Sequence, residues 1–498
     1  MLSFRITTFG SEFYIQDNNP KHASKLCKDY LQHLKVEGFI KVTEWPLQSP
    51  NPNSIKLLWE VLDREKTPYH FVPTDIVYLQ DQKKMSDILI VGNIIHCIGV
   101  YQVQLIENGY VLVKEGKITE VGSSSDLKVE GLIDTHIHAP QYPNVGLGYD
   151  KTLLDWLLTY TYPTEARYSD LDYSRTVYNA LVRKTLAYGT TTACYFGSLF
   201  RESTLVLTDA ITEHGQRAFV GKINMIRLAP DDYIETREES IAETDQFITD
   251  VRSRKNALVM PIITPRFALS VDTEFMRQLS VIARERDVHI QSHISENKDE
   301  IQSVHEQYHT DYATAYDKGD MLTNKTIMAH AVFLEDSELE LLEKRGTSLS
   351  HCPASNTLLK SGLCDIRRIQ KYNINIGLGT DVSGGASPSI INAMRSAITT
   401  SIHVSMRQEN YLPLTYEDVF YLATLGGAKA LSLADKIGNF QVGKEFDALV
   451  VDMKAANSSA DYFDNCTPME LLQKFVFLGD DRNVRTVFVD GKQVKPEI

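Results

Sequence analysis

Short hydrophobic runs rich in β-branched residues alternate with amphipathic stretches between about residues 131 and 381. This alternation is typical of repeated β-α units around a parallel sheet. The stretch 272–287 repeats Phe275, Leu279 and Ile282 at helical spacing, and the stretch 335–346 ends at Gly346. Eight strands are predicted, the number of a (β/α)8 barrel. They span residues 132–138, 190–196, 218–225, 258–264, 288–293, 326–330, 348–351 and 374–381.

Hydrophobic runs joined by glycine-containing turns also lie outside this region, at 88–97, 110–122, 437–452 and 484–494. They read as short strands that form one small β-domain from both sides of the barrel. The predicted fold is therefore α/β, a barrel with a flanking β-domain. The predicted domains are a separate segment at 1–80, a small β-domain at 81–130 and 432–498, and a barrel at 131–431.

Composition narrows the possible partners and compartments. The 498 residues are 43% hydrophobic and have a formal net charge of -14, typical of a soluble globular protein that repels phosphate backbones and anionic membranes. No apolar run of about 18 residues and no signal-peptide core is present. The six cysteines lack C-x-x-C spacing, which favours reduced thiols. We expect a cytosolic protein without membrane association.

Several predicted barrel strands end on residues that bind metals. His136 and His138 are two apart in DTHIHAPQY, so both imidazoles project from one face of an extended strand. Such a pair by itself is weak evidence for a metal. His293, His330 and Asp381 end three later strands, however, and chemistry in barrel enzymes sits at this rim. Imidazoles with one carboxylate suit a divalent ion such as zinc.

Six motifs together resemble the guanine deaminases of the amidohydrolase superfamily over roughly residues 88–498. They are GLIDTHIHAPQY, TPRF, HIQSHISENKDE, HCPASN, IGLGTDVSGG and LGDDRN. The resemblance implies a distorted barrel with a flanking β-domain and one catalytic Zn²⁺ per chain. It also implies hydrolysis of guanine by water to xanthine and ammonia, in purine catabolism, by a homodimer.

The resemblance also implies roles for single residues. The implied zinc ligands are His136, His138, His293 and Asp381. The implied catalytic groups are Asp381, the proton-shuttling Glu296 and His330, which contacts the reacting water. The implied substrate-binding residues are Gln141, Arg266, Phe267, His293, Glu296 and Asp381. From the local sequence alone, a carboxylate in the first turn of a helix is an equally good interpretation of Glu296.

Other functions stay open or are excluded by absent motifs. The chain lacks the H-x-E and P-C-x-x-C motifs of cytidine-type deaminases, a Walker loop and a G-x-S-x-G elbow. The alternatives are a deaminase of another purine-like, pterin or triazine ring, and a catalytically silent relative that binds a ligand without stoichiometric zinc.

Residues 13–65 resemble part of the catalytic domain of mariner-type DNA transposases. Asp17 matches the middle metal-binding acid of that family, but Lys56 stands at the final acid and the first acid is absent. One carboxylate does not hold the metal pair that phosphoryl transfer needs. Residues 1–80 contain nine Lys/Arg and nine Asp/Glu, so no basic patch for nucleic acid is present there. We interpret the segment as a transposon remnant fused to the gene or as a gene-model artefact, without transposase activity; a recruited DNA-contact function is the less favoured alternative.

The approach to the H-x-H strand is short in this chain. Members of the resembled family have a longer stretch there that ends in an apolar Pro-Gly turn, whereas SSSDLKVEG (123–131) runs straight into the strand. A missing strand would leave a sheet edge unpaired and displace His136 and His138. A displacement of about 1 Å can cost 10²-fold in rate. The sequence therefore also allows an impaired enzyme.

Overall fold

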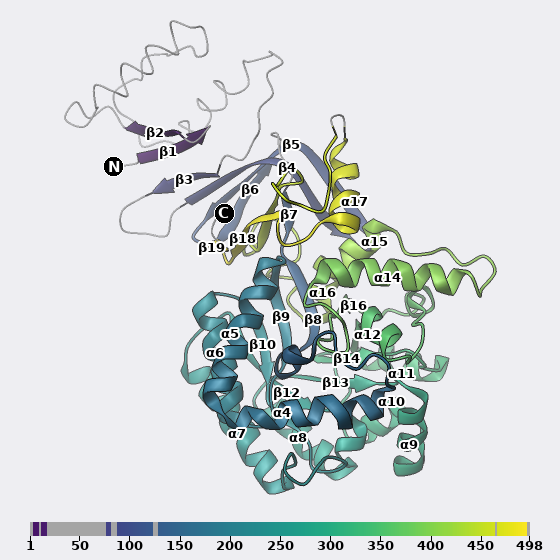
Figure 1. The fold of residues 1–498 in the computed structure, drawn as a ribbon. Coiled ribbons are helices and arrows are strands. Elements are labelled where there is room, and N and C mark those ends of the chain that lie inside the picture. Colours follow the sequence, from purple (N-terminus) through teal and green to yellow (C-terminus); the bar gives the residue numbers. More distant parts are fainter. Residues whose placement is uncertain are drawn as a thin grey trace, which may run out of the picture. The chain divides into compact units, whose positions relative to one another are not determined.

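The computed structural model describes residues 3–8, 11–16, 76–80, 87–122, 128–463 and 466–495 (Figure 1). The chain divides into two compact units, one within Met1–Ile94 and Ile106–Asp126 and the other within Ile95–Leu105 and Leu127–Ile498. Most of the transposase-like segment 13–65 lies outside the described residues. The prediction made for it therefore stays a prediction.

Antiparallel strands, including parts of β4 and β5, make up the described part of the first unit, and the pairing order is β2-β1-β3-β4-β5-β6. Their bounds are β1 Ser3–Thr8, β2 Ser11–Gln16, β3 Ile76–Gln80, β4 Asp87–Gly99, β5 Gln102–Lys114 and β6 Lys117–Gly122. Glu115 and Gly116, between β5 and β6, both have positive φ. Tight hairpin turns of this hand favour glycine because it has no Cβ. The predicted strand, turn and strand within 110–122 are confirmed.

A ring of parallel strands forms the centre of the second unit (Figure 1). Their bounds are β8 Leu132–His138, β9 Thr190–Phe196, β10 Arg217–Gly221, β11 Ile223–Asn224, β12 Val259–Pro265, β13 His289–Ile294, β14 Thr326–His330, β15 Ser348–His351 and β16 Ile376–Leu378. They pair in the order β16-β15-β14-β13-β12-β10-β9-β8, with β11 on β12. Every residue of β8, β9 and β14 is buried, as expected for strands covered on both faces.

Hydrogen bonds between the first and last strands help to close the ring. The Thr135 hydroxyl donates to the Leu378 carbonyl at 2.8 Å, and the Asp381 N–H donates to the His136 carbonyl at 2.9 Å. This arrangement is the predicted (β/α)8 barrel. It also brings both ends of the strand series to the same rim.

Two of the eight predicted barrel strands differ in the structure. The third, predicted as 218–225, is divided into β10 and β11. The eighth, predicted as 374–381, ends at Leu378, because the Thr380 N–H and hydroxyl donate to the Asp134 carboxylate instead of to a neighbouring strand. Asp381 therefore lies beyond the strand, with φ of 47°.

Helices follow most strands and surround the barrel (Figure 1). The main ones are α5 Leu171–Ala187, α6 Arg201–His214, α7 Arg237–Ser253, α8 Thr273–Glu285, α9 Lys298–Tyr308, α10 Tyr312–Lys318, α11 Asp336–Arg345, α12 Pro353–Leu358, α13 Ile366–Ile369, α14 Ile390–Ser405, α15 Tyr416–Tyr421 and α16 Gly427–Ala430. The predicted helices at 272–287 and 335–346 are α8 and α11, and Gly346 ends α11 with φ of 72°. In the described part of the chain, no helix is both long enough and apolar enough to cross a membrane.

Shorter helical segments follow two of the barrel strands. They are η1 Ala139–Asn144, α3 Leu153–Trp156, η2 Leu157–Thr161, α4 Tyr162–Ala166, η3 Arg167–Ser169 and η4 Ala268–Ser270, while η5 Leu422–Gly426 joins α15 to α16. The first five stand between β8 and β9. This region supplies several walls of the cavity described below.

A small antiparallel sheet in the second unit combines a strand before the barrel with strands after it. The order is β7-β17-β18-β19, with bounds β7 Lys128–Glu130, β17 Ala448–Val451, β18 Val484–Val489 and β19 Lys492–Lys495. α17 (Pro468–Leu478) lies between β17 and β18 in the chain. The prediction that both sides of the barrel contribute strands is confirmed. The strand predicted over 437–452 is shorter, however, because only residues 448–451 pair.

Substitution of Gly221, at the end of β10, tests how tightly the barrel strands pack. A Cβ there would lie 1.9 Å from the Thr264 hydroxyl and 2.3 Å from the Ile262 carbonyl oxygen. We expect Gly221→Ala to lower the free energy of unfolding by about 1–3 kcal/mol or more, because a backbone carbonyl cannot move aside cheaply. Urea unfolding measures it. The control is Gly99→Ala, whose nearest contact is the flexible end of Gln102 at 3.0 Å. An equal loss in both variants would contradict the packing argument.

Candidate active site

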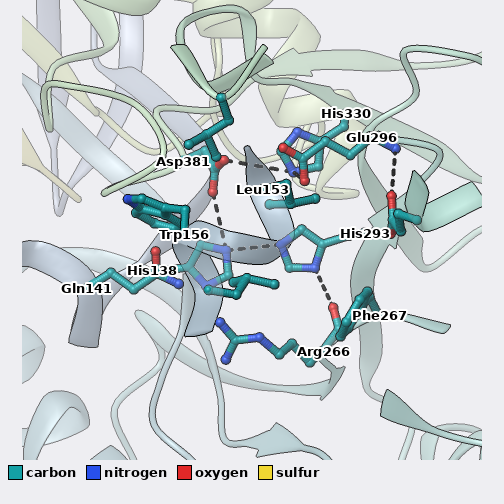
Figure 2. A pocket seen from close by; sticks show the side chains of 13 residues that line it. His138, Gln141, Leu153, Trp156, Arg266, Phe267, His293, Glu296, His330 and Asp381 are labelled. Atoms are coloured by element: carbon teal, nitrogen blue, oxygen red, sulfur yellow. Dashed lines mark hydrogen bonds and ion pairs between the residues drawn. The ribbon is translucent and has the colours of Figure 1, made fainter. Parts of the chain in front are cut away.

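Four metal-binding side chains meet at the rim of the barrel. His136 and His138 come from β8, His293 comes from β13, and Asp381 follows β16. All four are buried, and one ligand atom from each lies within 4.8 Å of the others. Figure 2 shows the carboxylate of Asp381 and the ring of His293 both directed toward the ring of His138. The alternation of side chains along β8 explains why residues two apart share this face.

The distances within this cluster leave little room between the donor atoms. Asp381 Oδ1 lies 3.2 Å from His136 Nε2 and 3.3 Å from His138 Nε2. The Nε2 atoms of His138 and His293 lie 3.0 Å apart. His136 Nε2 is buried beside Asp381 Oδ1. Imidazole nitrogens and a carboxylate oxygen that face one another this closely fit a shared cation.

Burial sets the protonation of the cluster. It lowers the pKa of His136 and His293, and that of His138 to about 4, so the imidazoles offer neutral lone pairs. Burial by itself would raise the pKa of Asp381, but hydrogen bonds from His136 and His138 hold it well below its usual range. Three neutral imidazoles and one carboxylate are a suitable donor set for a divalent metal.

A second group of three possible ligands, His136, His330 and Cys352, shares one histidine with the first. Burial raises the pKa of the Cys352 thiol well above its usual value, so it keeps its proton. A neutral thiol is a poor ligand, because metals bind the thiolate. The group that contains Asp381 is therefore the better candidate.

Neighbouring groups orient these ligands. His293 Nδ1 contacts the Arg266 carbonyl, which directs Nε2 toward the cluster. Asp134 accepts the His136 N–H at 3.2 Å and both polar groups of Thr380, the residue before Asp381. One carboxylate thus connects two ligand-bearing segments. The sequence analysis did not select Asp134, although it lies two residues before His136 in the same strand.

Glu296 and His330 lie beside the cluster, on β13 and β14 or just after them. His330 Nε2 is 3.4 Å from Glu296 Oε2 and 3.8 Å from Asp381 Oδ2. His330 Nδ1 lies 2.8 Å from Asn356 Oδ1, which orients the ring. His330 has φ of 80°, a strained conformation of the kind found at functional sites. Burial, together with the charges of Asp381 and Glu300, raises the pKa of Glu296 well above its usual value.

A cavity of about 40 Å³, partly open to solvent, lies against the cluster (Figure 2). The residues predicted from the sequence that line it are His138, Gln141, Arg266, Phe267, His293, Glu296, His330 and Asp381. His136 lies behind them in the metal cluster. The structure therefore brings together all nine predicted side chains. Their individual roles remain proposals.

The sequence analysis missed several walls of this cavity. Leu153, Trp156 and Leu157 from α3 and η2, Leu359, and the buried Glu300 also line it. The run TLLDWLLTY after β8 was a detectable signal, because a strongly apolar stretch in a rim loop needs a surface to cover. Glu165 in α4 was missed as well. It pairs with Arg266 at 2.6 Å and is completely buried.

A family model described as "Amidohydrolase family" matches residues 129–494. The chain belongs to the amidohydrolase family. The match covers the barrel and strands on both sides of it. A metal centre at the rim agrees with the metal dependence of this family.

Relatives of this amidohydrolase include several guanine deaminases. That of Rattus norvegicus is 46% identical over 383 residues, which are 75% of this chain and 84% of the relative. That of Dictyostelium discoideum is 40% identical over 437 residues, 81% of this chain and 97% of the relative. The crystal structure of guanine deaminase from C. acetobutylicum with bound guanine is 32% identical, with a TM-score of 0.78, and the match covers 82% of this chain and 99% of that one.

The short approach to His136 does not displace the site in the structure. Residues 123–127 lie outside the described residues, but β7 pairs with β17, so that edge has a partner. His136 and His138 lie within reach of the other ligands. The expected misplacement is therefore not observed. Whether catalysis is impaired stays a prediction.

Metal analysis tests the cluster. We expect the dialysed wild type to retain about one divalent ion per chain, since three protein ligands are the usual minimum for such a site and four converge here. His138→Ala is expected to lower metal affinity about tenfold or more. The control is His351→Ala, a buried histidine at the end of β15 that belongs to neither ligand group. Mass spectrometry of the bound metal measures both. Equal metal loss in both variants would contradict the assignment.

Proposed function

We propose that this amidohydrolase hydrolyses guanine to xanthine and ammonia, using a Zn²⁺ ion held by His136, His138, His293 and Asp381. The observation that supports it most is the cavity in which this donor set, a protonatable Glu296 and the ring-binding side chains Arg266 and Gln141 converge. The named relatives are guanine deaminases and match this chain over most of their length. Zinc, the cytosol and a homodimer remain predictions.

The reaction replaces an amino group by oxygen at one ring carbon. Water adds to C2 of guanine, the bond from C2 to the exocyclic nitrogen breaks, and ammonia leaves. When bound, a divalent cation supplies Lewis-acid activation of the attacking water. The protein residues supply the proton transfers and hold the ring in place.

Asp381 deprotonates the attacking water in this proposal, and His330 forms a hydrogen bond with it. The pKa of Asp381 lies well below its usual range, so its carboxylate is ionised and accepts a proton from the water. His330 lies 3.8 Å from Asp381 Oδ2 and is oriented by Asn356, which places its Nε2 to hydrogen-bond the same water.

Glu296 transfers protons to the guanine ring and to the leaving amine in this proposal. Burial raises its pKa well above its usual value and so favours the protonated carboxyl, which can donate to N3 while water adds to C2. The deprotonated Glu296 then transfers a proton from the added water to the departing amine. Two neighbouring carboxyl groups with pKa values shifted in opposite directions are a recurrent arrangement for acid and base roles.

Arg266 and Gln141 lie on the side of His138 away from Glu296 (Figure 2). Arg266 and Gln141 offer N–H donors to the carbonyl and N7 edge of guanine, and Phe267 offers an aromatic face. Trp156 and the leucines of the same cavity exclude water. An apolar cavity with a few oriented polar groups is the usual form of such a site.

Loss of the proton donor is the main test of the proposal. We expect Glu296→Gln to lower kcat for guanine by about 10²- to 10⁴-fold, because its amide cannot transfer the proton. Ultraviolet absorbance follows the conversion to xanthine. The control is Glu338→Gln, a buried carboxylate in the first turn of α11 outside the cavity. Absence of turnover in folded, zinc-loaded wild type would refute the proposed substrate.

Removal of residues 1–80 is a second test. We expect unchanged guanine turnover, since every proposed site residue belongs to the second unit. The same absorbance assay measures it, with thermal unfolding of both proteins as the control. A large fall in activity would show that the N-terminal segment is integrated into the fold.

A further inference from the structure

Glu165 is a buried carboxylate that contacts both proposed ring-binding residues. It lies in α4, and none of its surface is exposed. Arg266 donates to it twice, from its two terminal nitrogens, at 2.6 and 3.1 Å. Gln141 Nε2 donates at 2.9 Å, and the Tyr233 hydroxyl donates at 2.7 Å. The mechanism proposed above gives this residue no part.

The first consequence concerns the orientation of Gln141. A carboxylate only accepts, so the amide nitrogen of Gln141 must face Glu165. Its oxygen accepts the Ser383 N–H at 3.2 Å. Both ends of the amide are therefore assigned by partners whose own roles are unambiguous. One N–H of Gln141 is left for a ligand, and the oxygen is engaged elsewhere.

The second consequence concerns Arg266. The pair with Glu165 uses two of its five N–H donors and leaves three for other partners. It also offsets the guanidinium charge within the buried network. This end of the cavity is therefore neutral overall and presents N–H donors.

We infer that Glu165 determines specificity by positioning Arg266 and Gln141, so that the cavity selects a neutral purine with a carbonyl at C6 over one with an amino group there. The inference rests on the proposed function, because it assigns Arg266 and Gln141 to the ring. A C6 carbonyl and N7 both accept hydrogen bonds and match the donors. A C6 amino group places N–H against N–H and leaves buried donors unpaired.

A pair of unreactive ligands measures this selection without turnover. Hypoxanthine carries the carbonyl at C6 and adenine carries the amino group, and both lack the amino group at C2 that leaves. We expect wild type to bind hypoxanthine about 10²-fold or more tightly than adenine, because sites built around such donors discriminate strongly. In Glu165→Gln the Gln141 amide can turn, so the preference should fall by about tenfold or more. Isothermal titration calorimetry gives both constants.

Matched variants separate this role from a structural one. Asp447→Asn breaks another buried pair, in which Arg217 donates twice to Asp447 at 3.0 and 3.2 Å outside the cavity. It should lower the unfolding temperature as Glu165→Gln does but leave the ligand preference unchanged. Glu165→Asp keeps the charge and should restore part of the preference. An unchanged preference in folded Glu165→Gln would overturn the inference.

If Glu165→Gln does not fold, a variant that lacks both buried charges tests the inference instead. Glu165→Gln combined with Arg266→Met removes both buried charges, and its preference should fall below that of Arg266→Met alone because Gln141 is no longer oriented. Equal preferences in these two proteins would overturn the inference.

Guanine kinetics distinguish the two proposals. We expect kcat/KM for guanine to fall about 10²-fold in Glu165→Gln, since a misplaced ring loses its alignment with the reacting groups. If wild type does not turn over guanine, the proposed function fails, while the hypoxanthine and adenine pair still reports on Glu165. Wild-type turnover together with an unchanged kcat/KM in Glu165→Gln would refute the positioning role.

Discussion

The buried contact of the Asp381 carboxylate with His136 and His138 is the interaction on which the rest of the site depends. It joins the first and last strands of the barrel at the rim, where Asp381 also donates its backbone N–H to His136. A negative charge at this depth requires partners. Neutral imidazoles surround it, so closure of the barrel also brings together the proposed metal ligands.

Carboxyl groups in this site acquire different roles from their surroundings. Hydrogen bonds to Asp381 hold its pKa low, whereas burial and the nearby charges of Asp381 and Glu300 raise the pKa of Glu296, which accepts a weak hydrogen bond from Ser361. Glu165 has a third environment, in which Arg266 lowers its pKa against the effect of burial. Carboxyl groups thus have proposed roles in metal binding, proton transfer and orientation within one cavity, because their neighbours differ.

The rim loop between β8 and β9 links the fold to ring recognition. It supplies Gln141, the apolar wall around Trp156, and Glu165 on α4. These residues reach one cavity because the loop packs back over the carboxyl ends of the strands. Barrel enzymes commonly vary their substrates through such loops while the strands hold the catalytic groups. The proposed metal ligands come from strand ends and from Asp381, whereas the proposed ring-binding network combines this loop with Arg266 and Phe267 after β12.

The sequence by itself determined the barrel and the sheet built from both of its sides, and predicted the proposed ligands His136, His138 and His293, because strand periodicity and strand ends are local properties. Tertiary structure alone decided that Asp381 lies beyond its strand, since Asp134, far away in the chain, takes the hydrogen bonds of Thr380. It also decided the role open to Glu165, whose partner Arg266 lies 101 positions away. A carboxylate on a short helix has no distinctive local pattern. The role proposed for Glu165 depends on the Arg266 guanidinium that folding places beside it.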